Sequence, residues 1–343
     1  MTNKEYGSDF HYISNSDFRI NSGVACFFNG TEQFYFSGRV ALRAIICNGI
    51  DKHSWKKIYI PTYYCHEVYD FIRDLNICLE FYECNPETNV LPSSIEDEGN
   101  SALLVVNYFG ISTANFEHLK NIKIIEDVTH DLSTFNLSKA DYVFGSLRKI
   151  LPVPVGGFVK SNEVLPKVPL TLFAENVTQE KFAGMLLKKK YLEGNFKEKE
   201  IFRALLINAE HSFENPDTFS ILPQSVKGYL LGLDVTKIIE VKRQNSVLAK
   251  KAIHKTTKFE LLISDGNNEY ALIFKFNNTE QRELLKKKLI LHKIYPMVLW
   301  PNQLNEKDIE LENRLLFVHI DFRYSVEDMN YIVNIINQFI ADV

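Results

Sequence analysis

The fold is decided by residues 122–161, IKIIEDVTHDLSTFNLSKADYVFGSLRKILPVPVGGFVKS. This stretch contains three short apolar runs, 122–127, 140–146 and 156–161, which predict buried strands separated by turns and short polar segments. The first run ends in two acids, and the second ends at Ser146, three residues before Lys149. In open α/β sheets, ligands bind beyond the carboxyl ends of the strands. The stretch therefore predicts a sheet with a ligand site at one edge.

The preceding residues continue the pattern of short apolar runs and helical segments. Strands are predicted over 56–61, 77–84 and 102–110, and a helix is predicted over 65–75. Apolar strands that alternate with helices and loops are typical of an α/β domain with a largely parallel sheet. We expect such a domain to bury both faces of its sheet.

The second half of the chain has a different texture. Residues 181–213 and 226–234 are predicted to be mostly helical, and Lys188–Lys190 is expected to be a solvated helix face. A long helix is predicted over 236–253. Strands then alternate with helices, with strands at 259–264, 270–276, 295–300 and 314–322, and helices over 279–293 and from Ser325. The last residues therefore predict a small α+β unit.

The composition excludes several classes of protein. A length of 343 residues suggests about two domains, and 45% hydrophobic residues argue against global disorder. The formal net charge of −4 gives no electrostatic reason to expect nucleic acid as a partner. No apolar run approaches the ~18 residues of a membrane span, and the first residues contain no apolar leader. We predict a cytoplasmic protein with neither a membrane nor a nucleic-acid partner.

Common cofactor and metal motifs do not occur. No Gly-x-Gly-x-x-Gly follows a strand, and no Gly-x-x-x-x-Gly-Lys-Ser/Thr is present. The nine histidines are scattered without His-Glu-x-x-His, and the five cysteines lack the spacing of a zinc ribbon or a disulfide framework. We predict no metal site and reduced thiols.

Three local features carry possible chemistry, and each also has a purely structural interpretation. Asp127 at the end of a buried strand needs a partner, which a cationic ligand group or an ordinary turn would supply. Lys149 just past a strand end can lose its proton and form a Schiff base, or it can be a plain surface lysine. The turn Ser37-Gly38-Arg39 before a predicted helix is either a phosphate cup or a simple helix cap.

The order and spacing of these segments resemble fold-type I pyridoxal-phosphate (PLP) enzymes. The chain most resembles the DegT/DnrJ/EryC1/StrS group of sugar-nucleotide aminotransferases, as a divergent short branch. The resemblance covers nearly the whole chain. It is carried by FSGRVALRAI (36–45), KIYIPTYYCHEV (57–68), LLVVNYFG (103–110), IKIIEDVTHDL (122–132), YVFGSLRKILPVPVGGF (142–158), KGYLLGLDVTKIIEVKRQNSVLAKKAI (227–253) and RLLFVHIDFRYSVEDMNYIVNII (314–336).

The resemblance implies catalytic roles for two residues. Lys149 would bind PLP covalently, and Asp127 would pair with the pyridine nitrogen so that the ring acts as an electron sink. His130 occupies the position where the family has Gln or His beside the ring oxygen. Other cofactor contacts implied by the resemblance are the phosphate ligands Ser37, Gly38, Arg39 and Ser146, the ring-covering Tyr64, and Asn107 next to the ring or substrate.

The lysine loop departs from the group's usual pattern. The segment between Ser146 and Lys149 is shorter than usual, although Ser-x-x-Lys occurs in other fold-type I aminotransferases. Pro154-Val155-Gly156-Gly157 replaces the group's Gly-Glu-Gly-Gly. These departures bear on which substrate is bound more than on whether PLP is bound.

The resemblance implies a large domain of mostly parallel sheet and a small C-terminal α+β domain. We expect an N-terminal arm over 1–30, the PLP-binding domain over 31–235, and the linking helix with the small domain over 236–343. The implied function is an aminotransferase that takes an amino group from a small donor and passes it to a keto group of a nucleotide-linked sugar, in a homodimer. The alternatives are another PLP reaction, such as that of a lyase or aldolase, and an inactive relative with a binding or regulatory role.

Overall fold

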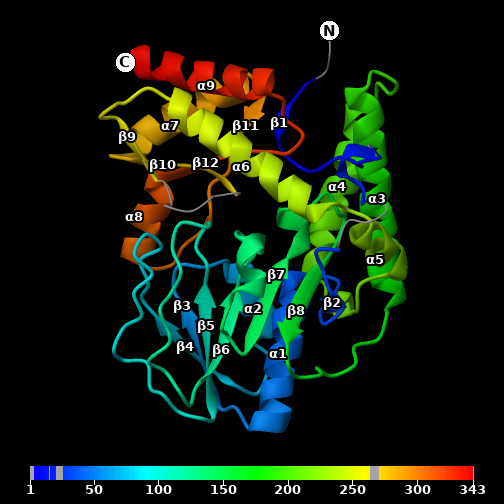
Figure 1. Ribbon diagram of the computed structural model, residues 1–343, viewed down its shortest axis with the longest axis vertical. Coiled ribbons are helices and arrows are strands. Elements are labelled where there is room, and N and C mark those ends of the chain that lie inside the picture. Colours follow the sequence, from blue (N-terminus) through cyan, green and yellow to red (C-terminus); the bar gives the residue numbers. More distant parts are fainter. Residues whose placement is uncertain (1–3, 15, 21–25, 263–269, 343) are drawn as a thin grey trace.

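The computed structural model of the protein describes residues 4–14, 16–20, 26–262 and 270–342. A large sheet with its helices forms the lower part of the view in Figure 1, and a smaller α+β unit lies above it. The long helix α6 (Val235–Ala252) runs between the two parts. Among the described residues, no helix is long and apolar enough to cross a membrane.

The large sheet has seven strands and is mostly parallel. In spatial order they are β2 (Gln33–Tyr35), β8 (Gly157–Ser161), β7 (Tyr142–Ser146), β6 (Lys123–Asp127), β5 (Ser101–Val106), β3 (Lys57–Pro61) and β4 (Cys78–Tyr82). Strands β3 to β7 pair in parallel, whereas β8 is antiparallel to both β7 and β2. Every residue of β5 is buried, which explains its unbroken apolar run. The predicted α/β class with a largely parallel sheet is confirmed.

Two short helices follow the first strands of this sheet. Helix α1 (Gly38–His53) begins at the predicted turn, where the Ser37 hydroxyl accepts the N–H of Val40 at 3.3 Å. It packs on β7 and β8, which keeps its first turn next to the ends of the central strands. Helix α2 (His66–Ile72) follows β3.

A helical hairpin lies beside the large sheet. Helices α3 (Leu172–Leu192) and α4 (Lys199–His211) pack along each other, and α5 (Gln224–Leu231) follows before α6. The predicted helical region 181–213 is therefore interrupted over 193–198. The prediction that Lys188 is solvated is wrong, because its buried amine donates to the carbonyl of Asp9 at 2.6 Å. The hairpin thereby holds the N-terminal segment (Figure 1).

The small unit is built on an antiparallel sheet of β9 (Phe259–Leu262), β10 (Ala271–Phe276) and β12 (Leu315–His319). The last two residues of the strand predicted over 259–264 lie outside the described residues. Helices α7 (Thr279–Leu291) and α9 (Val326–Ala341) were expected, whereas α8 (Glu306–Arg314) was not. Ser325 and Asp328 form a capping box at the start of α9.

The strand predicted over 295–300 is wrong for most of its length. Only β11 (Ile294–Tyr295) is a strand, and it pairs in parallel with β1 (Tyr6–Gly7). Pro296 has no N–H to continue a ladder, and beyond it Met297 makes only an isolated bridge to Phe317. The N-terminal segment is therefore part of the small unit, with Tyr6 in its hydrophobic core.

Candidate active site

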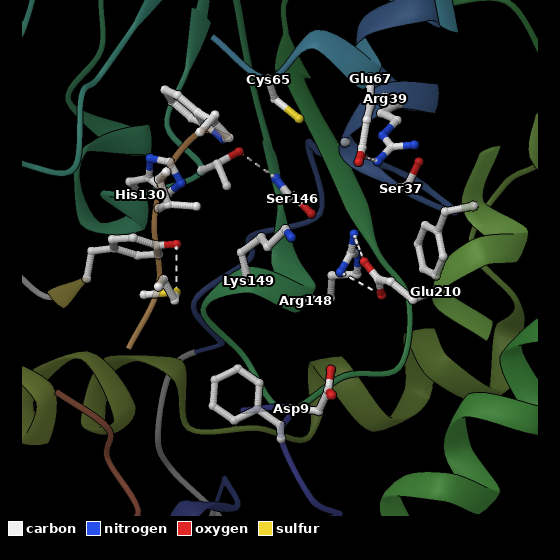
Figure 2. Close-up of a pocket in the computed structure, with 18 of the residues that line it drawn as sticks. Asp9, Ser37, Arg39, Cys65, Glu67, His130, Ser146, Arg148, Lys149 and Glu210 are labelled. Atoms are coloured by element: carbon white, nitrogen blue, oxygen red, sulfur yellow. Dashed lines mark hydrogen bonds and ion pairs between the residues drawn. The ribbon is translucent and has the colours of Figure 1, made fainter. Parts of the chain in front are cut away.

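A cavity of about 550 Å³ lies where the carboxyl ends of β6 and β7 meet the small unit. Its walls come from the large sheet, the α3–α4 hairpin, the N-terminal residues 8–10 and the segment 295–301. Figure 2 shows side chains from these elements converging on one space. Eight of the nine predicted site residues line it: Ser37, Gly38, Arg39, Tyr64, Asp127, His130, Ser146 and Lys149.

Lys149 ends a single 3-10 turn that directly follows β7. Its side chain is exposed to the cavity rather than packed in the core, and Figure 2 shows it extending toward Ser146. The neighbouring charge of Arg148, together with loss of hydration, lowers the pKa of this amine to about 8. A neutral, nucleophilic fraction of Lys149 is thus present near neutral pH.

Asp127 is the last residue of β6 and is buried. One carboxylate oxygen accepts the Thr129 N–H at 2.9 Å, and the other accepts the hydroxyl of Tyr64. Burial raises the pKa of Asp127, and these hydrogen bonds oppose the rise. The carboxyl group is therefore fixed in place with a defined orientation at the cavity wall.

A cup of hydrogen-bond donors lies at the start of α1. A Cβ on Gly38 would approach the Cβ of Ser146 to 3.1 Å, and a Cβ on Gly157 would lie 2.2 Å from the carbonyl oxygen of Ser37. Both glycines therefore allow the first turn of α1 to lie directly against the end of β7. The N–H groups of that turn and the serine hydroxyls form the kind of site that binds a phosphate group. The guanidinium of Arg39 at this cup pairs with Glu67 of α2.

His130 lies among aromatic rings on the opposite side of Lys149 from Arg148 (Figure 2). Its ring centre is 4.2 Å from that of Tyr270 and 5.4 Å from that of Trp300. Burial lowers the pKa of His130 to about 3, so the imidazole is neutral at physiological pH. The ring is thus available as a neutral donor or acceptor.

Asn107 is the predicted residue that the structure leaves out of the cavity lining. Its buried side chain donates to the hydroxyl of Thr134 at 3.2 Å, and its backbone N–H donates to the carbonyl of Asp127 at 2.9 Å. Asn107 therefore holds the segment behind Asp127. A direct contact of Asn107 with a ligand stays a prediction.

Sequence reasoning missed the residues that the hairpin and the small unit bring to the cavity. Lys181 and Glu210 come from α3 and α4, and Trp300 comes from the segment after β11. One signal was present in the sequence: Lys181 and Lys188 fall on the same helical stripe as Val177 and Met185, which predicts an apolar face. A lysine on such a stripe indicates a buried amine with a local partner.

The residues around the cavity fit PLP. An amine with a lowered pKa, a fixed buried carboxylate and a phosphate-type cup are the three groups that the aldehyde, pyridine nitrogen and phosphate of PLP require. All three lie on the walls of one cavity.

Comparison with known proteins identifies the fold. No family model and no curated protein matches the sequence. Among solved structures, the chain is similar to PseC of Helicobacter pylori, an aminotransferase involved in the biosynthesis of pseudoaminic acid, with a TM-score of 0.61, 11% identity, and coverage of 99% of this chain and 100% of that chain. It is also similar to sugar aminotransferase CalS13 of Micromonospora echinospora (TM-score 0.55, 10% identity, 90% and 87% covered).

A third similar structure is the GDP-4-keto-6-deoxy-D-mannose-3-dehydratase of E. coli with bound hydrated PLP, with a TM-score of 0.58, 13% identity, and coverage of 89% of this chain and 87% of that chain. The chain therefore has the fold of fold-type I PLP enzymes, and the predicted fold class is confirmed.

Proposed function

We propose that this chain is a PLP-dependent aminotransferase that places an amino group on a keto carbon of a nucleotide-linked sugar. The observation that carries the proposal is the shared cavity, in which the Lys149 amine, the Asp127 carboxylate and the cup around Ser37 lie on adjoining walls. An ordinary surface lysine has neither a lowered pKa nor such neighbours.

Each residue has a distinct task. Lys149 would hold PLP through its amine, and its Nζ, once released, would accept the proton from the α-carbon of the amino donor. Asp127 would keep a proton on the pyridine nitrogen. Bound PLP supplies an electron-withdrawing ring that stabilises the negative charge left at that α-carbon. Ser146 and the first turn of α1 would hold the phosphate.

The substrate class is supported by the neighbours in fold. CalS13 is a sugar aminotransferase, and a further neighbour, DesI, was solved in the presence of its TDP-sugar product. PseC, an aminotransferase involved in the biosynthesis of pseudoaminic acid, aligns over essentially the whole of both chains. We extend this to an amino donor and a keto sugar as the two small-molecule partners. A homodimer is part of the proposal, by analogy with the fold.

Covalent loading of Lys149 tests the proposal. Purified protein mixed with PLP should gain the absorption of a lysine-bound cofactor, and borohydride should then attach the cofactor irreversibly to Lys149, as located by peptide mass spectrometry. Lys149→Ala should abolish both signals. Lys188→Met is a matched control, because burial also lowers the pKa of Lys188 to about 8 but Lys188 does not line this cavity. A wild-type protein without absorption or adduct would refute the cofactor assignment.

The amino donor separates the aminotransferase from its alternatives. Glutamate or another donor should bleach the absorption of the loaded protein, and a keto sugar nucleotide should restore it. If no donor bleaches the loaded protein, a lyase or an inactive relative explains the site better.

A further inference from the structure

Three charged side chains meet on the hairpin side of the cavity. Arg148 Nη2 lies 2.7 Å from Glu210 Oε1, Arg148 Nη1 donates to Glu210 Oε2 at 3.1 Å, and Lys181 Nζ lies 2.6 Å from the same Oε2. The Lys181 side chain is 5% exposed and the Arg148 side chain 10%. Two cations thus share one carboxylate, and the cluster has a surplus of one positive charge.

One edge of the Arg148 guanidinium is unused. Glu210 occupies the edge formed by Nη1 and Nη2. The Nε–H is buried and, among the described residues, no atom accepts its hydrogen bond. A buried donor without a partner is costly, whereas the Nε–Nη2 edge of a guanidinium matches two oxygens of a carboxylate or phosphate. This edge therefore indicates an oxyanion as its partner.

Contacts place Arg148 at the cup of α1. Its guanidinium carbon lies 4.4 Å from the ring centre of Phe213. The ring of Phe213 packs in turn against Phe36, the residue before Ser37, at 4.9 Å between ring centres. Figure 2 shows Arg148 between Lys149 and Ser37, beside Ser146.

The positive charge at the cup itself is already paired or reduced. Arg39, its own cation, is paired with Glu67, and the lowered pKa of Lys149 reduces the charge of that amine. A phosphate monoester carries up to two negative charges, and an enclosed site needs compensating charge for it. The surplus positive charge of the Arg148, Lys181 and Glu210 cluster is a source of such compensation, and all three residues line the same cavity as the cup.

We propose that Arg148, held by Glu210 and flanked by Lys181, is a phosphate-binding residue of the cofactor site, so that the α3–α4 hairpin takes part in cofactor recognition. This inference rests on the proposed function. The ligand group is the phosphate monoester of PLP, whose negative charge Arg148 would balance from the cavity wall that it lines.

Pyridoxal, which lacks the phosphate, is the matched probe. Affinities of wild type and Arg148→Gln for PLP and for pyridoxal are measured by absorption titration, and the PLP-to-pyridoxal affinity ratio is compared. The ratio should fall on the order of 10- to 100-fold in Arg148→Gln, because a hydrogen-bonded charged partner of the phosphate is lost. Any change in the basicity of Lys149 acts on both probes and cancels in the ratio. Arg148→Lys should give an intermediate ratio, since it keeps the charge without the planar fork.

Arg43→Gln is the control variant. Arg43 lies on α1 and, like Arg148, donates to a carboxylate, Asp74 Oδ2, at 2.8 Å, but it does not line the cavity. The PLP-to-pyridoxal affinity ratio of Arg43→Gln should equal that of wild type. An unchanged ratio in both Arg148 variants would overturn the inference while leaving the proposed function intact. A wild type that takes up neither PLP nor pyridoxal would instead refute the proposed function.

Discussion

The cavity has two walls that are built differently. The strand-end wall, with Asp127, Ser146 and Lys149, comes from residues at the carboxyl ends of neighbouring parallel strands. The hairpin wall, with Lys181 and Glu210, comes from two helices whose contributing residues are 29 positions apart. The strand-end wall carries the groups that fit cofactor chemistry, and the hairpin wall carries charge that acts on those groups. We expect substitutions in the first wall to remove function and those in the second wall to tune it.

The largest expected effect is at Asp127. Asp127→Asn should slow the donor-driven bleaching of the loaded protein on the order of 10³-fold, because a preorganised charge at the pyridine nitrogen is lost. The measurement is a stopped-flow trace of cofactor absorption. Glu126→Gln is the control, since Glu126 is equally buried on the same strand but does not line the cavity. Equal rates in the two variants would contradict the assignment of Asp127.

The next largest effect is at Gly157, where the strand-end wall meets α1. Gly157→Ala should destabilise the fold by about 1–3 kcal/mol, because its Cβ would lie 2.2 Å from the carbonyl oxygen of Ser37. Gly228→Ala, at an exposed position of α5 with nothing near its Cβ, should stabilise by about 0.5–1 kcal/mol. Denaturant unfolding measures the change in the free energy of unfolding for both variants. The two changes are expected to have opposite signs.

A smaller effect is expected at Tyr64. Its hydroxyl donates to Asp127 and lowers the pKa of that carboxyl group. Tyr64→Phe should therefore slow donor-driven bleaching about tenfold, the worth of one hydrogen bond to a charged group. Tyr63→Phe is the matched control, because the Tyr63 hydroxyl donates to the carbonyl of Leu299 at 2.5 Å instead. If Tyr63→Phe slows donor-driven bleaching as much as Tyr64→Phe does, the Tyr64 hydroxyl has no specific role.

The smallest effect lies within the turn that follows β7. Arg148 is the main cause of the lowered pKa of Lys149, so Arg148→Gln should move that pKa from about 8 upward toward the ordinary value. The neutral fraction of Lys149 near neutral pH should then fall severalfold. The pKa of Lys149 is measured from the pH dependence of its acylation in the cofactor-free protein, followed by peptide mass spectrometry. An unshifted midpoint would show that Arg148 does not set the pKa of Lys149.

The lowered pKa of Lys149 also determines how the stability of the fold changes with pH. Between pH 8 and the ordinary lysine pKa, the unfolded chain keeps the Lys149 proton and the folded chain does not. Because the unfolded state then binds more protons, the contribution of Lys149 to stability increases as the pH rises through this window. In Arg148→Gln this increase should begin at higher pH.

The sequence alone predicted the strand-end wall well. Buried strands of a parallel sheet appear as apolar runs, and the polar residues that follow them must meet at one edge. The pattern predicts Asn107, Asp127 and Ser146 at strand ends, and the structure brings Asp127 and Ser146, together with Lys149, to the cavity wall. The turn before α1 is also predicted from the sequence, because an N-cap serine followed by a glycine is a local signal.

Only the tertiary structure decided the hairpin wall. The helical pattern of residues 181–213 predicts neither where the chain turns nor which face meets the cavity. It therefore favours a solvated Lys188 and does not single out Lys181, although both side chains are buried. The segment after β11 was predicted as a strand for the same reason, since periodicity cannot distinguish a ladder from a cavity-lining stretch interrupted by Pro296. Local patterns determine strands, caps and the residues at strand ends. The partners of a buried charge are set by long-range packing, which no local pattern records.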